Sequence, residues 1–297
     1  MKIGYPCINT SIGCTSNRTF RLKSYSEEKL RYKIRMNLKC LEETLIYNQQ
    51  HNLLFFRMGS GIIPFASHPI CKVDWADEFQ KELESIGNFT KKYKFRISMH
   101  PDQFVVINSP DKSVVERSIA ELEYHSKLMD TMKLDSTCKI QIHVGGKYGD
   151  IYSAMDRFMD RYSGLDEKIK KRLAIENDDR LFSLRDCLHI SKRVKIPVIF
   201  DTLHHECNNN NEPIGKAMES AFKTWKRKDG IPMIDYSSQK KGARKGSHTE
   251  SIDTKHFRDF LEKSRGLDFD LMLEIKDKEK SALKARKIMG SERSARV

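Results

Sequence analysis

Six acidic or imidazole residues each end a short apolar segment of this 297-residue sequence. In chain order they are His100, His143, Glu176, Asp201, Asp235 and Glu274. Two imidazoles and four carboxylates would be unfavourable to bury together unless cations lay between them. Mixed imidazole and carboxylate donors suit Zn, Mn, Fe or Co. A single His or Asp in such a place commonly has a structural role, but six in series predict a polynuclear metal centre.

The apolar segments predict strands, and the amphipathic segments between them predict helices. The expected strands lie at residues 2–4, 53–57, 95–100, 138–143, 173–176, 197–201, 232–235 and 270–274. The expected helices lie at 27–48 with Ser26 as N-cap, at 75–92, from a capping box of Ser113 and Glu116 onward, and at 181–192, 213–225, 254–263 and 277–289.

Eight short strands alternating with helices predict a single (β/α)8 TIM barrel over residues 1–289, with residues 290–297 as a disordered tail. A doubly wound open sheet is the alternative, but no G-x-G-x-x-G follows the first expected strand. In a barrel, the carboxyl ends of all the strands meet at one rim, where barrel enzymes carry out their chemistry. The barrel fold would therefore bring the six predicted metal ligands together at one rim.

Three further histidines lie in loops that follow expected strands: His68, His204 and His248. Asp201 and His204 could bind one metal ion from a single turn, and His248 could supply another donor. Four other histidines fall within or beside expected helices, where we expect surface positions: His51, His125, His189 and His256.

Residues 237–248 form a loop with four basic side chains: Lys240, Lys241, Arg244 and Lys245. Such a loop is commonly no more than a flexible solvated segment. Beside a metal centre, the same composition also suits contact with a phosphate backbone. The formal net charge of +13 likewise favours a polyanionic partner, although many basic proteins bind none.

No segment approaches the ~20 apolar residues that a membrane span requires, and the first residues lack an apolar signal core. We therefore expect a cytoplasmic protein with no membrane partner. The seven cysteines are odd in number and contain no C-x-x-C pattern. They predict reduced thiols with structural or incidental roles rather than disulfides.

Eight short motifs in series resemble those of the UV damage endonucleases. They are GYPCIN at 4–9, R-x-GS with PFASH at 57–68, MHPDQF at 99–104, HVGG at 143–146, IEND at 175–178, D-x-x-HH at 201–205, DYSSQ at 235–239 and LE-x-KDK at 273–278. The resemblance covers nearly the whole chain. It implies a TIM barrel related to endonuclease IV that nicks DNA immediately 5′ of UV photoproducts and depends on divalent metal, notably Mn.

The resemblance implies that one metal ion is held by His100, His143 and Glu176. A second would be held by Glu176, Asp201, Asp235 and Glu274, with Glu176 bridging, and a third by His204 and His248. The catalytic residues would be Glu176, Glu274 and His68. Lesion contacts are implied for Tyr5, Gln103 and Phe104, and further DNA contacts for Asn9, Arg57, Ser60, His68, Lys276, Lys240, Lys241 and Arg244.

Two positions depart from the family pattern. Some relatives carry His where this chain has Asp235, and the extra carboxylate favours Mn or Mg over Zn. Third sites of the endonuclease IV type take an Asp two residues before the last His, where this chain has Gly246. The third site would then be completed by water or by Asp201. We expect two or three divalent ions, with Mn favoured and Mg, Co or Zn as alternatives.

The expected reaction is hydrolysis of the DNA backbone 5′ to cyclobutane dimers and 6-4 photoproducts by metal-activated hydroxide, leaving a 3′-OH and a 5′-phosphate. The partner is lesion-containing duplex DNA, and no protein partner is implied. One alternative is an abasic-site endonuclease resembling endonuclease IV, and another is a metal-dependent sugar isomerase or epimerase on the same barrel. A metal-bearing DNA-binding module without catalysis is a third.

Overall fold

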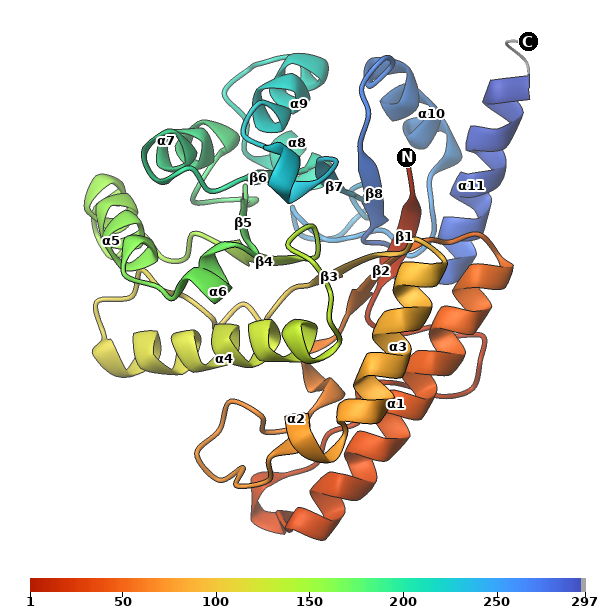
Figure 1. Ribbon diagram of the computed structural model, residues 1–297. Coiled ribbons are helices and arrows are strands. Elements are labelled where there is room, and N and C mark those ends of the chain that lie inside the picture. The colour runs from red at the N-terminus through yellow and green to blue at the C-terminus, as the bar shows by residue number, and fades with distance from the viewer. Residues whose placement is uncertain (295–297) are drawn as a thin grey trace.

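Eight parallel strands close into a barrel in the order of the chain, which confirms the predicted TIM barrel (Figure 1). The computed structural model describes residues 1–294, with side chains up to residue 290. The strands are β1 (Ile3–Pro6), β2 (Phe55–Met58), β3 (Arg96–Met99), β4 (Lys139–His143), β5 (Leu173–Glu176), β6 (Val198–Asp201), β7 (Met233–Tyr236) and β8 (Asp270–Leu273).

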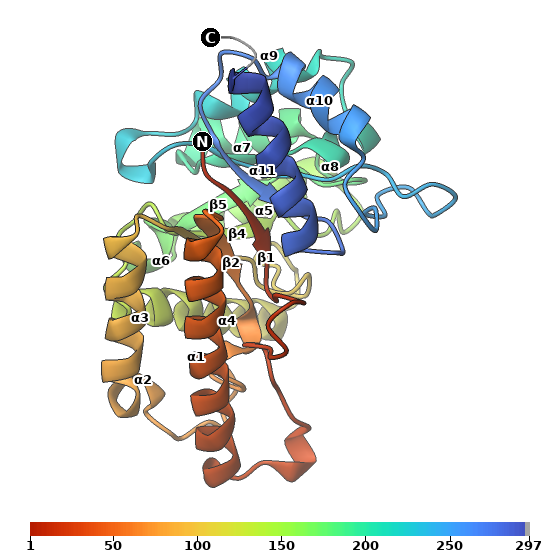
Figure 2. The same cartoon turned by 90° about the vertical axis from the view of Figure 1, so that its right-hand side faces the viewer.

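Helices surround the barrel, and α1 and α3 pack side by side on its outside (Figures 1 and 2). The α-helices are α1 (Glu27–Gln50), α2 (Trp75–Glu78), α3 (Gln80–Lys92), α4 (Lys112–Thr131), α5 (Ile151–Ser163), α6 (Glu167–Lys170), α7 (Leu184–Val194), α8 (Thr202–Cys207), α9 (Ile214–Phe222), α10 (Thr254–Lys263) and α11 (Glu279–Ser294). Short 3-10 helices are η1 (Leu22–Ser24), η2 (Ser60–Ile62) and η3 (Arg227–Asp229).

Several expectations about helix boundaries are wrong; for example, α7 begins at Leu184 rather than at residue 181, and α9 ends at Phe222 rather than at residue 225. Residues 75–92 form two helices, because the buried Phe79 between them leaves the helical conformation. Helix α4 begins at Lys112 with Asp111 as N-cap, because the Asp111 carboxylate accepts hydrogen bonds from both the amide and the hydroxyl of Ser113. Helix α11 continues to Ser294 instead of ending before residue 290, and residues 295–297 lie outside the described residues.

Side-chain alternation in the strands separates the barrel interior from the surface that the helices cover. In β4, Ile140 and Ile142 belong to the main hydrophobic core, whereas Gln141 lies in the barrel interior, where it contacts carboxylates of other strands. Among the described residues, no helix has the length and apolar character needed to cross a membrane.

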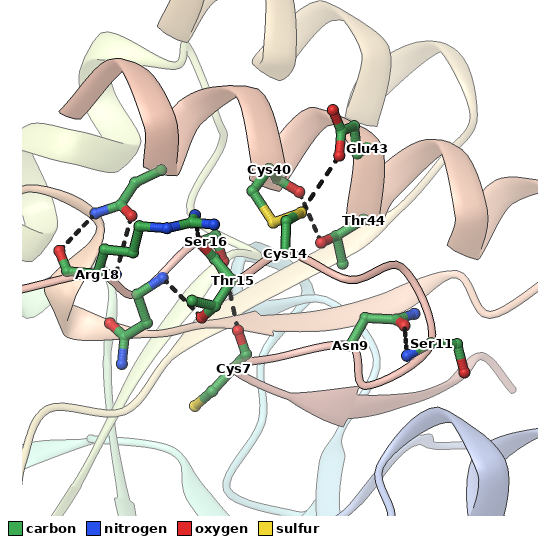
Figure 3. Close-up of a disulfide and its surroundings, with 12 residues drawn as sticks. Cys7, Asn9, Ser11, Cys14, Thr15, Ser16, Arg18, Cys40, Glu43 and Thr44 are labelled. Atoms are coloured by element: carbon green, nitrogen blue, oxygen red, sulfur yellow. Dashed lines mark hydrogen bonds between the residues drawn. A yellow bond between two sulfur atoms is a disulfide. The ribbon is translucent and has the colours of Figure 1, made fainter. Parts of the chain in front are cut away.

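Two of the seven cysteines form a disulfide, which corrects the expectation of seven reduced thiols. Cys14 of the β1–α1 connection is bonded to Cys40 of α1, and their Cα atoms are 5.9 Å apart (Figure 3). The same connection is held to α1 by Asn37, whose side-chain oxygen accepts a hydrogen bond of 2.9 Å from the Arg18 amide. The two cysteines are separated by 26 positions, so their spacing in the sequence gave no indication that they pair.

We expect Cys40→Ser to lower the free energy of unfolding by about 3 kcal/mol, because the disulfide restricts the unfolded chain. Urea unfolding of the variant and of the wild type, without reductant, measures the difference. Thiol titration of the denatured, unreduced wild type should find the five free cysteines. Seven titratable thiols, or equal stability of the two proteins, would contradict the prediction.

Candidate metal centre

Backbone pairing between neighbouring strands brings four of the predicted ligands to the same rim of the barrel. His143 of β4 is the register partner of Glu176 of β5, and Asp201 of β6 is the register partner of Asp235 of β7. His100 and Glu274 directly follow β3 and β8. The sequence prediction that these six residues share one rim is therefore confirmed.

Glu176 lies between two histidines at this rim. One of its oxygens, Oε2, is 3.3 Å from His100 Nε2 and 3.6 Å from His143 Nε2. The other ring nitrogen of His100, Nδ1, donates to the Pro101 carbonyl at 2.8 Å, which leaves Nε2 with its lone pair available for a metal. These three side chains present donor atoms within 4.8 Å of one another, as a metal site requires.

Glu176, Asp201 and His204 form a second group with metal-site spacing. His204 Nδ1 lies 3.1 Å from Glu176 Oε1 and 3.7 Å from Asp201 Oδ1. Asp201 is the N-cap of α8, so its Oδ1 accepts from the His204 amide at 2.6 Å. Glu176 belongs to both groups, in agreement with the bridging role expected for it.

The electrostatics of the two groups favour a cation between them. Burial alone would raise the pKa of Glu176, but His143, His100 and His204 hold it well below its ordinary value. Burial raises the pKa of Asp201 to about 7, against the lowering effect of His204. Asp201 Oδ2 is also buried without a hydrogen-bond partner among the described residues. Because an unpaired buried oxygen is unfavourable, this atom and the N/O donor set fit a divalent metal ion.

Asp235 and Glu274 lie beside Arg57 rather than beside the histidines that hold Glu176. Arg57 Nη2 donates to Asp235 Oδ1 at 2.7 Å, and Nη1 donates to Glu274. Arg57 is itself buried, so it lies beneath the rim and not in a DNA-facing groove, where the resemblance placed it. The second predicted ligand set is therefore divided: Glu176 and Asp201 are together with His204, and Asp235 and Glu274 contact Arg57.

His204 and His248 approach each other, as the third predicted set requires, with ring centroids 6.3 Å apart. His248 Nδ1 donates to the Glu274 carbonyl at 2.6 Å, which orients the ring. At Gly246, a Cβ atom would lie 2.4 Å from Asp179 Oδ2. The space beside residue 246 is thus already filled by a carboxylate from the β5–α7 connection.

The expected lesion-contact residues fall in two different environments. Gln103 and Phe104 are exposed in the connection after β3, and Phe104 has 75% of its surface accessible. Tyr5 is fully buried, because its hydroxyl donates to Asn48 at 2.6 Å and accepts from Asn9 at 2.8 Å. Tyr5 and Asn9 could therefore reach DNA only after rearrangement of the β1–α1 connection.

The remaining predicted DNA contacts surround the rim. His68 is exposed, and its Nδ1 accepts from the Ile70 amide at 3.1 Å, whereas Ser60 is half-buried near the His100 carbonyl. Figure 2 shows the β7–α10 connection projecting from the barrel. On it, Lys241 and Arg244 are exposed. Lys240 and Lys276 both pair with Glu250, the latter at 2.9 Å, so their charges are partly neutralised.

Sequence reasoning missed three buried polar residues near the centre. Gln141 donates from Nε2 to both Glu176 and Asp235. Asn177 joins β5 to β6 through hydrogen bonds with the amide and the carbonyl of Asp201, of 3.0 and 3.1 Å. His125, expected at the surface, is fully buried beside Glu121. The alternation of strand residues could have identified Gln141, because it precedes His143 by two positions.

Comparison with known proteins agrees with this geometry. A family model described as UV-endonuclease UvdE matches residues 1–294. The chain belongs to this family. A UV DNA damage endonuclease of Clostridium perfringens (strain 13 / Type A) is 43% identical over 286 residues, covering 96% of this chain and 69% of the relative. One of Bacillus cereus (strain Q1) is 31% identical, covering 95% and 92%.

A solved structure titled "Crystal Structure of SacUVDE" superposes on this UvdE-family chain with a TM-score of 0.94 and 45% identity, covering 98% of each chain. A structure of L-ribulose 3-epimerase superposes with a TM-score of 0.58 and 16% identity, covering 85% of this chain and 88% of the epimerase. At that identity the likeness shows a shared barrel fold.

We expect the metal-free protein to become less stable as the pH rises from 6.5 to 8.5. Burial alone would lower the pKa of His204, but Asp201 and Glu176 raise it to about 12. The folded protein then keeps a proton that the unfolded chain releases above pH 6.5, so stability present below pH 6.5 is lost as the pH rises. The loss is about 2 kcal/mol over this range.

Urea unfolding with a chelator, repeated across the pH range, measures this dependence. The His204→Asn variant is the control, because an amide cannot titrate and its profile should be flatter than that of the wild type. A wild-type stability that stays constant or rises between pH 6.5 and 8.5 would contradict the raised pKa of His204.

Proposed function

We propose that this protein is a metal-dependent DNA-repair endonuclease that nicks the backbone 5′ to UV photoproducts and leaves a 3′-OH and a 5′-phosphate. The observation that carries the proposal is the Glu176-centred cluster, which shares the barrel rim with the exposed Phe104 and a projecting basic loop. Membership of the UvdE family supports the same substrate. Acting on chromosomal DNA, the enzyme would work in the cytoplasm.

The chain's residues would hold divalent metal through His100, His143 and Glu176 and through Glu176, Asp201 and His204. When bound, such ions neutralise the phosphodiester, lower the pKa of water and stabilise the leaving oxygen. Mn is the ion we favour, because carboxylate-rich sets with imidazole suit it. Gln141 fixes the orientation of Glu176 through its hydrogen bond to Oε2.

Recognition of the lesion would rest on the exposed residues after β3. Photoproducts stack and pair poorly, so extruding their nucleotides costs less free energy than extruding intact ones. Phe104 offers an aromatic face to fill the gap that they leave, and Gln103 beside it can donate and accept hydrogen bonds. Lys241 and Arg244 would contact phosphates and add affinity that is independent of sequence.

The test is nicking of UV-irradiated and untreated supercoiled plasmid, with Mn²⁺ and with a chelator. We expect conversion to the open circle only for irradiated plasmid with Mn²⁺. Two defined duplexes, one with a thymine dimer and one with an abasic site, then separate the alternatives. Incision of the abasic duplex alone would indicate an abasic-site endonuclease, and binding without any nicking would indicate a DNA-binding module.

A sugar epimerase is the less supported alternative. The sugar epimerases of known structure share only the fold with this chain. Binding of a small sugar would not require the projecting basic loop or the exposed Phe104. Ketose epimerisation in the absence of plasmid nicking would establish it instead.

A further inference from the structure

Two buried aspartates lie next to each other at the rim, and they differ in their hydrogen-bond partners. Asp201 and Asp235 are register partners on adjacent strands, and neither side chain has accessible surface. Both are therefore candidates for the second metal ion on position alone. Their hydrogen bonds distinguish them.

Both carboxylate oxygens of Asp235 already have donors. Oδ1 accepts from Arg57 Nη2 at 2.7 Å, and Oδ2 accepts from Gln141 Nε2. Gln141 is held in this orientation because its Oε1 accepts from the same Arg57 nitrogen at 2.8 Å. An ion pair with this burial is strongly favoured over either charge alone, so Asp235 is bound to a permanent cation.

Asp201 has one free oxygen. Its Oδ1 accepts from the His204 amide at 2.6 Å, whereas Oδ2 is buried and has no hydrogen-bond partner in the part of the chain that the structure describes. A buried carboxylate oxygen without a donor is unfavourable unless a cation approaches it. The neighbouring His204 and Glu176 complete a donor set with metal-site spacing.

Arg57 and Gln141 are hydrogen-bonded to each other in the barrel interior, below the rim. Arg57 also donates to Glu274 and Gln141 to Glu176, so the two side chains hold three of the four rim carboxylates in place. The guanidinium cancels one of the four carboxylate charges. Three negative charges then remain. Two divalent ions would neutralise them and leave one positive charge to interact with a phosphate.

We propose that Asp235 is the counter-ion of Arg57 and not a metal ligand, and that Arg57 and Gln141 are positioning residues which leave Asp201 as the only aspartate that binds the second ion. The inference rests on the metal-dependent function proposed above. It departs from the ligand set that the family resemblance implied, in which both aspartates bind metal.

The isosteric variants Asp201→Asn and Asp235→Asn form a matched pair for the test. Each purified protein is loaded with Mn²⁺ at pH 8, dialysed, and analysed for bound Mn per chain by elemental analysis, and EPR of free Mn²⁺ gives the Kd. We expect Asp201→Asn to lose one ion per chain or to bind it more than 100-fold more weakly. Asp235→Asn should keep the wild-type number of ions with a Kd within about tenfold.

Thermal melting of the chelator-treated proteins gives an independent readout of the Arg57–Asp235 pair. Asp235→Asn should lower the Tm, because it leaves the buried Arg57 under-compensated, and the Arg57→Gln/Asp235→Asn double variant should recover part of the loss. If Asp235→Asn fails to fold, the Arg57→Gln/Asp235→Asn double variant removes both charges and carries the metal measurement.

Loss of an ion in Asp235→Asn, or in the double variant that replaces it, overturns the inference, as does wild-type metal content in Asp201→Asn. These outcomes neither support nor refute the proposed function. A wild-type protein that binds metal but does not nick irradiated DNA would refute the function and leave the ligand assignment intact.

Discussion

Glu176→Gln is expected to reduce incision of a UV-damaged duplex by at least about 10³-fold while changing DNA affinity by no more than a few fold. Glu176 is the residue that both candidate metal groups share. Replacing its charge with an amide weakens both groups at once, and the amide nitrogen would face the Gln141 amide that now donates to it. The residues proposed to contact phosphates lie on loops outside this cluster, so binding should persist.

The measurement is single-turnover incision with saturating Mn²⁺, paired with binding to the same duplex in a chelator. Glu167→Gln is the matched control, because this glutamate is 85% exposed on α6, which precedes β5 and lies at the opposite end of the strands. Normal turnover by Glu176→Gln would exclude the metal centre described above. Loss of binding together with incision would point to misfolding, which circular dichroism would detect.

Phe104→Ala is expected to lower incision of a thymine-dimer duplex by about 10- to 100-fold, equivalent to the 1–3 kcal/mol that an aromatic stacking contact contributes. Binding to undamaged DNA should stay within about twofold, because Phe104 carries no charge for the phosphates. The side chain is 75% exposed, so its removal leaves no cavity and should not change the Tm.

Tyr32→Ala is the control for this variant, because Tyr32 is also an exposed aromatic residue, 57% accessible, and lies on the outer helix α1. It should incise both kinds of duplex as the wild type does. If Phe104→Ala retains full incision, or if it weakens binding to damaged and undamaged DNA equally, Phe104 has no role in selecting the lesion.

The barrel and the location of the candidate metal centre could be predicted from the sequence because both depend on local patterns. Period-two alternation in a strand fixes which side chains face the interior, and the last residue of each apolar segment fixes the rim. His143, Glu176 and Asp201 were placed correctly on this basis, since each ends its strand. The sequence predicted one continuous helix at 75–92 and an end of the last helix that is too early. Both are local errors at element boundaries, where such patterns are weakest.

The partners of these residues could not be predicted, because they come from distant parts of the chain. Arg57 reaches Asp235 across 178 positions, and only closure of the barrel brings β2 and β7 to opposite sides of the same interior. The same holds for Tyr5, whose burial depends on Asn48 of α1, and for the bond between Cys14 and Cys40.

The sequence by itself therefore determined which residues can carry the chemistry, because side-chain type and strand periodicity are properties of neighbouring positions. Only the tertiary structure decided which of two adjacent aspartates has a free oxygen and which is bound to a cation. That distinction depends on a guanidinium and an amide supplied by β2 and β4, and packing of the closed barrel interior places them there.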